Sequence, residues 1–224
     1  EKKIVRWLEF IQPHAAELYL VGDIFDFWFE YKHAVPRGYV RLLGTLAKLS
    51  DAGVKLHFFT GNHDMWVFDY LPNELGATIY RNPVTVTLND KTFFIGHGDG
   101  LGPGDKGYKF IKKIFASKIC QWLFARFHPN FGTWLANYFS RSSRSATGNT
   151  DEIYLGDDKE FLMVFCNAYI KQHHVDYFIF GHRHLVLDKP IGKNARYINL
   201  GTWLNNSMYA VWDGQNLSLQ KFDG

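Results

Sequence analysis

Five short apolar runs in this chain each stop at a glycine that is followed by polar residues. The five junctions are Val21-Gly22-Asp23, Thr60-Gly61-Asn62-His63-Asp64, Ile95-Gly96-His97, Phe180-Gly181-His182-Arg183-His184 and Leu200-Gly201-Thr202-Trp203. Continuous apolar runs of this length are typical of strands buried on both faces of a sheet. Because ligands bind outside the carboxyl ends of parallel strands, the polar residues after the glycines are expected to converge there. The pattern therefore predicts an α/β fold with its site at one sheet edge.

The segments around these runs predict the remaining elements. The expected helices span residues 3–12, 38–51 and 161–171, and the expected strands span 18–21, 56–59, 83–88, 92–95, 177–180 and 197–200. Strand, helix and strand in succession over residues 18–59 predict a βαβ unit with parallel strands. Alternating residues around Asn89-Asp90 predict a hairpin, and Asp213-Gly214 predicts the turn of a second one.

Length and composition favour one globular domain with an insertion. The chain has 224 residues, of which 46% are hydrophobic and 21% charged, and this excludes a disordered or fibrous protein. Cys120 and Cys166 match no metal or disulfide spacing and suit a reducing compartment. No run of eighteen apolar residues and no secretory signal occur, so no membrane-spanning helix is expected.

Positive charge is concentrated in the middle of the chain. Residues 101–150 contain eight Lys or Arg and one acidic residue, and ten aromatic residues lie between Tyr108 and Phe139. Basic amphipathic helices with Phe and Trp on the other face are typical of membrane-surface elements or acyl-chain pockets. We therefore predict a basic, aromatic helical lid at 101–145, inserted into a core of residues 1–100 and 146–224. An ordinary helical subdomain with a solvated basic face is the alternative.

Stacking of single-stranded nucleic acid on these aromatic residues is a further alternative for the basic segment. Nothing else in the chain forms a recognition helix or a single-strand-binding barrel pattern. Nucleic acid is therefore not an expected partner.

The polar residues at the strand ends are oxygen and imidazole donors. The set is Asp23, Asp26, Asn62, His63, Asp64, His97, Asp99, His182 and His184. These donors suit Mn, Fe, Zn or Ni, whereas the set is too rich in histidine for Ca. One such residue alone is more often an ordinary turn or surface residue, but their occurrence at successive strand ends favours a metal site. In extended backbone His182 and His184 lie on one side, so both are expected to face the cluster.

Four ordered motifs carry a family resemblance: GDxxD at 22–26, GNHD at 61–64, GHGD at 96–99 and GHxH at 181–184. In this order they resemble the calcineurin-like metallophosphoesterase superfamily. The resemblance implies a four-layer αββα sandwich with two divalent metal ions, Mn first and Fe or Zn as alternatives. The roles that it implies for the metal ligands are Asp23 as bridging ligand, Asn62, His97 and His182 at one metal, and His184 at the other. It implies that His63, steadied by Asp64, is the catalytic group that protonates the leaving oxygen or stabilises the phosphoryl group.

One motif of the superfamily has no counterpart here. An Asp-x-His on an opening strand supplies two further ligands to the second metal, and no such strand precedes Asp23. We expect this strand to lie upstream of Glu1, because a mature chain seldom starts inside a βα unit. The alternative is a second metal site that keeps only Asp23 and His184, which are too few ligands.

Within the superfamily, residues 22–28 and 97–108 resemble the UDP-2,3-diacylglucosamine pyrophosphohydrolase branch. This resemblance implies cleavage to UMP and 2,3-diacylglucosamine 1-phosphate in lipid A synthesis, in the cytoplasm and in peripheral contact with the anionic inner membrane. It also implies that Asp105 and Tyr108 contact the glucosamine part of the substrate. Guanidinium forks suit phosphate oxygens, so Arg141 and Arg144 are expected to pair with the diphosphate.

His63 departs from that branch, which has Arg at this position of its GNxD motif. Two other functions therefore stay open. The first is a metallophosphodiesterase that acts on another nucleotide or phosphodiester. The second is a non-catalytic lipid-surface binding protein on a decayed phosphoesterase scaffold.

Overall fold

The computed structural model describes residues 1–104, 106–136, 138 and 153–224. The helices are α1 (Lys2–Ile11), α2 (Val40–Asp51), α3 (Tyr70–Leu75), α4 (Lys106–Ala116), α5 (Lys118–Phe124) and α7 (Phe161–Tyr169). The strands are β1 (Glu17–Val21), β2 (Lys55–Phe59), β3 (Thr78–Tyr80), β4 (Val84–Leu88), β5 (Lys91–Gly96), β6 (Tyr177–Phe180), β7 (Val186–Ile191), β8 (Ala195–Leu200), β9 (Met208–Trp212) and β10 (Leu217–Lys221).

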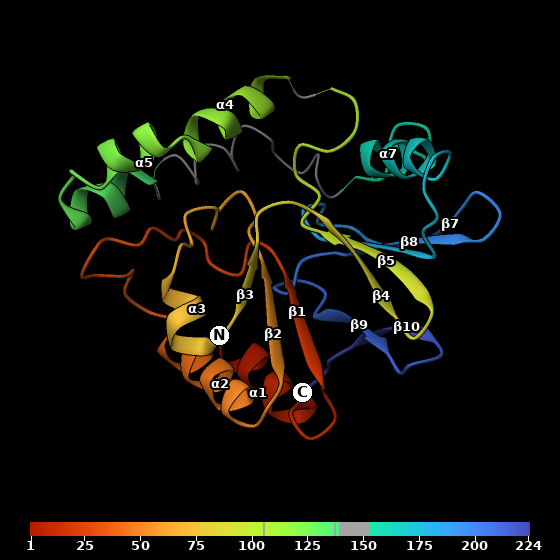
Figure 1. Cartoon of the computed structure of the whole chain (residues 1–224), viewed down its shortest axis with the longest axis horizontal. Helices are drawn as coiled ribbons and strands as arrows, with labels where there is room; N and C mark the ends of the chain where they lie inside the picture. Colours follow the sequence, from red (N-terminus) through yellow and green to blue (C-terminus); the bar gives the residue numbers. More distant parts are fainter. Residues whose placement is uncertain (105, 137, 139–152) are drawn as a thin grey trace.

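The strands form two main sheets and one separate hairpin (Figure 1). A three-stranded sheet has the order β1-β2-β3 and is parallel, so the βαβ unit predicted over β1, α2 and β2 is confirmed. The other sheet has the order β4-β5-β6-β8-β7, with parallel β5, β6 and β8 and antiparallel strands at both edges. Both predicted hairpins, β4–β5 and β9–β10, are present.

Helices cover the outer faces of both sheets. Helices α1 and α2 pack on the three-stranded sheet through Trp7, Leu8, Leu42, Leu46 and Leu49, which meet Leu18, Leu20, Leu56 and Phe58. Helix α7 packs on the five-stranded sheet through Leu162, Met163 and Cys166. The inner faces of the sheets meet around Val21, Phe59, Ile95, Ile179 and Ile198. These layers confirm the predicted αββα sandwich.

Three elements were not predicted from the sequence. Strand β3 has three residues and α3 has six, so neither shows a full period of apolar residues. Strand β7 contains Pro190, which argues against a central strand, and it lies at the edge of its sheet, where proline is tolerated.

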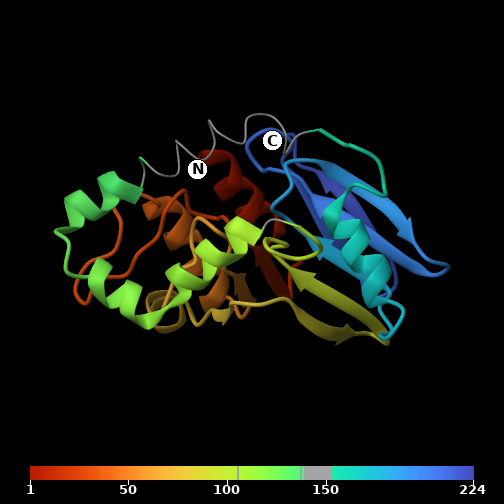
Figure 2. The ribbon, with the colours of Figure 1, turned by 90° about the horizontal axis from the view of Figure 1, so that it is seen from above.

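Helices α4 and α5 form an arm above the half of the molecule that holds the three-stranded sheet (Figures 1 and 2). No side chain of α4 is buried. Helix α5 is anchored by Phe124, which packs against Phe29 and Trp66. Within the described ranges, no helix combines the length and the apolar character needed to cross a bilayer.

Candidate metal centre

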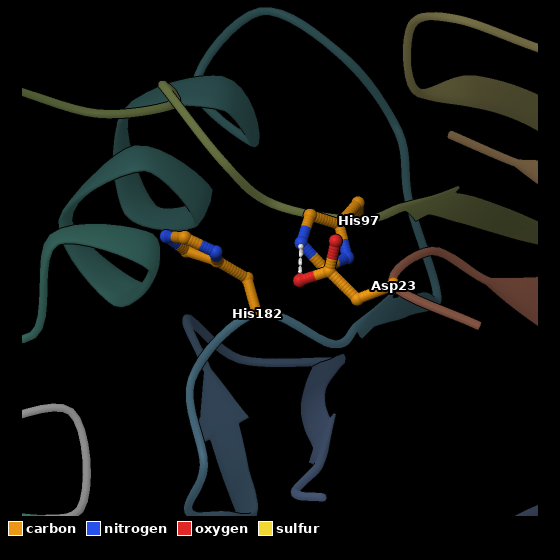
Figure 3. A group of neighbouring side chains, drawn as sticks. All are labelled: Asp23, His97 and His182. Atoms are coloured by element: carbon orange, nitrogen blue, oxygen red, sulfur yellow. Dashed lines mark ion pairs between the residues drawn. The ribbon is translucent and has the colours of Figure 1, made fainter. Parts of the chain in front are cut away.

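Three predicted ligands lie together at the ends of their strands (Figure 3). The ligand atoms of Asp23, His97 and His182 all lie within 4.8 Å of one another. The Asp23 Oδ2 atom is 3.1 Å from His97 Nε2, and the ring centroids of His97 and His182 are 5.1 Å apart. These residues follow β1, β5 and β6, which belong to two different sheets. The structure thus brings together the ends of three strands far apart in the sequence.

Two glycines allow the loops to approach this closely. A Cβ atom on Gly22 would collide with the His97 ring, and one on Gly61 would collide with the Asp23 carboxylate. Both Asp23 and His182 have left-handed backbone, with φ of 53° and 60°. Residues other than glycine adopt this conformation at a cost, and such strain is concentrated at functional sites.

His97 has the surroundings of a metal-binding histidine. Its Nδ1 atom lies 3.0 Å from the Val21 carbonyl oxygen, which only accepts, so this hydrogen-bond network assigns a proton to Nδ1. The Nε2 atom is directed to the Asp23 carboxylate and lies 3.2 Å from Asn62 Oδ1. Metal-ligating histidines usually donate their other ring N–H to such an outer partner, which fixes the ring orientation.

Asp23 and His97 stabilise each other's charge in the metal-free protein. Burial raises the pKa of Asp23, but the nearby His97 outweighs it, so the pKa lies well below the usual range. Burial lowers the pKa of His97, but Asp23 outweighs it and raises the pKa to about 9. A histidine must lose a proton to bind a metal, so occupation of this site would release one.

The donors present fit a divalent metal ion. One carboxylate, two imidazoles and the Asn62 amide oxygen are compatible with Mn, Fe or Zn. His184 is exposed, and it lies outside the cluster found among the described residues. The extended conformation expected for His182 and His184 does not occur, because the φ of His182 is 60°. His184 as a ligand of a second metal stays a prediction.

Asp64 ties the loop after β2 to the loop after β1. Its side chain is fully buried and accepts the N–H groups of Gly61, at 2.7 Å, and of Ile24, at 2.8 Å. Burial, together with the charge of Asp23, raises the pKa of Asp64 to about 7. The His63 N–H donates to Asp23 Oδ1 at 2.9 Å. The backbone that carries His63 is therefore held at the metal cluster from both sides.

Of the predicted substrate-binding residues, Tyr108 lies within the described part of the chain, and it is outside this cluster. The Tyr108 hydroxyl donates to Asp99 Oδ2 at 2.6 Å, and the Tyr108 ring centroid is 6.5 Å from that of His182. Asp105, Arg141 and Arg144 lie outside the described residues. Sequence reasoning gave no role to Lys112, whose Nζ atom is 2.6 Å from the same Asp99 oxygen. Tyr108 and Lys112 are four residues apart on a helix, so their spacing could have indicated that both side chains lie on one face and share a partner.

An αββα sandwich with carboxylate, imidazole and amide donors at its strand ends has the architecture of a metal-dependent hydrolase. The family model described as Calcineurin-like phosphoesterase matches residues 2–186. The chain therefore belongs to the calcineurin-like phosphoesterases, as its motifs predicted, and it is a metal-dependent hydrolase.

Curated relatives match along nearly the whole chain. A UDP-2,3-diacylglucosamine hydrolase of Porphyromonas gingivalis is 40% identical over 100% of this chain and 90% of its own length. The enzymes of the same name from Aeromonas salmonicida and Chromohalobacter salexigens are 27% and 31% identical, over 93% and 88% of this chain and 81% and 79% of their own. Among solved structures, Zn-bound Vps29 from Entamoeba histolytica aligns over 89% of this chain and 88% of its own, with a TM-score of 0.35 and 13% identity.

Proposed function

We propose that this phosphoesterase hydrolyses the diphosphate of UDP-2,3-diacylglucosamine to UMP and 2,3-diacylglucosamine 1-phosphate. The observation that carries the proposal is the position of α4, whose apolar side chains are exposed and whose Tyr108 ring lies 6.5 Å from the ring of His182 in the cluster of candidate metal ligands. A substrate with acyl chains at one end and a diphosphate at the other requires both features in one site. The names of the relatives support the same substrate.

Asp23, Asn62, His97 and His182 would hold one divalent metal ion, for which we propose Mn, and Asp23 and His184 would contribute to a second. When bound, the metal supplies Lewis-acid stabilisation of the charge on the phosphoryl oxygens. We assign His63 the transfer of a proton to the leaving phosphate oxygen. Asp64 supports this step because it fixes the loop that carries His63.

The helical arm is proposed as the lid of the acyl-chain site, within the insertion at 101–145. The exposed apolar side chains of the arm are Phe110, Ile111, Ile114, Phe115, Ile119, Trp122 and Leu123, and the described residues that follow it add Phe127, Phe131, Trp134 and Tyr138. The lysines of α4 and α5 accompany them, and the Arg126 guanidinium lies 4.5 Å from the centre of the Trp122 ring. Apolar rings beside basic groups favour peripheral contact with an anionic membrane, which we place at the cytoplasmic side of the inner membrane.

Release of UMP tests the proposed function. The full-length protein is expected to release UMP from UDP-2,3-diacylglucosamine with added Mn²⁺, and to lose this activity when a chelator removes the metal. Cleavage of a simple aryl phosphodiester without UMP release would contradict the lipid substrate and leave a general metallophosphodiesterase. Absence of both activities would favour the decayed scaffold.

Membrane contact is tested with vesicles. We expect Trp122→Glu to weaken binding to phosphatidylglycerol vesicles about tenfold, because a large apolar side chain no longer enters the interface. The matched control is Phe10→Glu, on α1, because the exposed fractions of Phe10 and Trp122 are 58% and 56%. Co-sedimentation measures both variants. Equal losses in the two would contradict the assignment of α5 as the contacting surface.

A further inference from the structure

Helix α4 is attached to the rest of the molecule by polar contacts. None of its side chains is fully buried, and the packing of the Phe115 ring against Trp66 accompanies the polar contacts. The Tyr108 hydroxyl and the Lys112 ammonium group both contact Asp99 Oδ2, each at 2.6 Å. Lys112 Nζ also donates to the Asp99 carbonyl oxygen at 3.3 Å. Tyr108 and Lys112 are one helical turn apart, so a single carboxylate holds one face of the helix.

Asp99 is a buried residue next to the Asp23–His97–His182 cluster. It lies two residues after His97, just beyond the end of β5, and its exposed fraction is 7%. A carboxylate buried to this degree requires charged or hydrogen-bonding partners. Two of these partners, Tyr108 and Lys112, come from α4, and the charge of His97 adds to them. Lys109 lies between Tyr108 and Lys112 in the sequence, and its Nζ atom donates a hydrogen bond of 2.6 Å to the Gly102 carbonyl oxygen.

A second attachment holds the other end of α4. The Trp66 indole N–H donates to the Phe115 carbonyl oxygen at 2.8 Å, and the two ring centroids are 5.6 Å apart. Trp66 follows Asp64 by two residues, in the loop that also carries His63. Helix α4 therefore bridges the loop with His97 and the loop with His63, and its position is tied to both.

We propose that Asp99 is a positioning residue, which holds Lys112 and Tyr108 so that α4 keeps a fixed place over the Asp23–His97–His182 cluster. Lys112 then determines specificity for substrates that carry an apolar part. This inference rests on the proposed function. An acylated substrate must engage the apolar arm and the phosphoryl site at once, and a misplacement of about 1 Å costs roughly a hundredfold in rate. A small phosphodiester uses the phosphoryl site alone.

Three variants separate this role from a merely structural one. Lys112→Met removes the ammonium group that contacts Asp99, and Lys112→Arg restores a cation of similar reach. Lys113→Met is the matched control, because it removes the same charge from an exposed position on the same helix. None of the three changes a residue placed at the metal cluster.

The first measurement is hydrogen exchange of the full chain without substrate. We expect Lys112→Met to raise exchange of the α4 amides about tenfold over Lys113→Met, because a charge-assisted contact has been lost. Equal exchange in the two variants would overturn the proposal. This result does not depend on any substrate, so it separates failure of the positioning role from failure of the proposed function.

The second measurement compares two substrates. We expect Lys112→Met to lower kcat/KM for UDP-2,3-diacylglucosamine roughly 10- to 100-fold, and to leave that for bis(p-nitrophenyl) phosphate within about twofold. Lys112→Arg should recover most of the loss, and Lys113→Met should lose little. Equal losses on both substrates would contradict a specificity role. If the wild-type protein releases no UMP, the proposed function fails, and the exchange result alone decides the role of Asp99.

Discussion

Replacement of His97 by alanine is expected to remove the bound metal and to abolish hydrolysis. The His97 ring is buried, contacts Asp23 and Asn62, and is held by the Val21 carbonyl oxygen, so its replacement removes a firmly oriented donor from the cluster. The loss in metal affinity should exceed the roughly 10–100-fold cost of removing an outer-shell partner. Metal content after dialysis and UMP release, measured on the same sample, check this prediction.

The controls for this experiment separate metal loss from misfolding. His97→Asn keeps an N–H that reaches the Val21 oxygen, and it should fold while still losing the metal. His14→Ala removes an exposed histidine that is distant from His97 in the sequence, and it should change neither the metal content nor the release of UMP. Full metal stoichiometry in a folded His97 variant would show that His97 is not a ligand.

Replacement of His63 by alanine is expected to leave the metal in place and to lower kcat roughly 10²–10⁴-fold, the usual contribution of a general acid. The reason is that His63 contacts Asp23 through its backbone N–H, which alanine retains. Metal binding and catalysis should therefore separate in this variant. Steady-state kinetics and metal analysis on the same preparation measure the two effects.

Two outcomes would contradict the role assigned to His63. Unchanged turnover would contradict the catalytic role. Loss of metal along with activity would mean that His63 supports the cluster instead.

The sequence was sufficient to predict the layers and the place of the site. The run at residues 18–21 is apolar because both faces of β1 are buried, one by helices and the other by the second sheet. The run at 56–59 is interrupted by His57, which stacks on Tyr19. Parallel strands end at the same sheet edge. The proximity of Asp23 to the residues after β2 could therefore be predicted without knowing any side-chain contact. Local pattern and tertiary structure agree here.

Contacts between distant segments were not predictable in the same way. The left-handed backbone of His182 is set by the loop after β6 and its surroundings, and no local signal distinguishes it from extended chain. Asp99 was recognised only as one polar residue among several. Its contacts with Tyr108 and Lys112 depend on the position of α4 relative to the strand ends, and tertiary structure sets that position.

The candidate metal ligands lie at the junction of two sheets, with Asp23 after a strand of one and His97 and His182 after strands of the other. An ion bound there would add a cross-link between layers that otherwise meet through apolar packing and through polar contacts such as the hydrogen bond of His97 to Val21. A core substitution at Ile95 or Ile198 that slides one layer along the other would therefore change the spacing of the ligands. Metal affinity in this protein thus depends on how the two sheets pack against each other. Core substitutions far from the reacting atoms can therefore change activity by changing metal affinity.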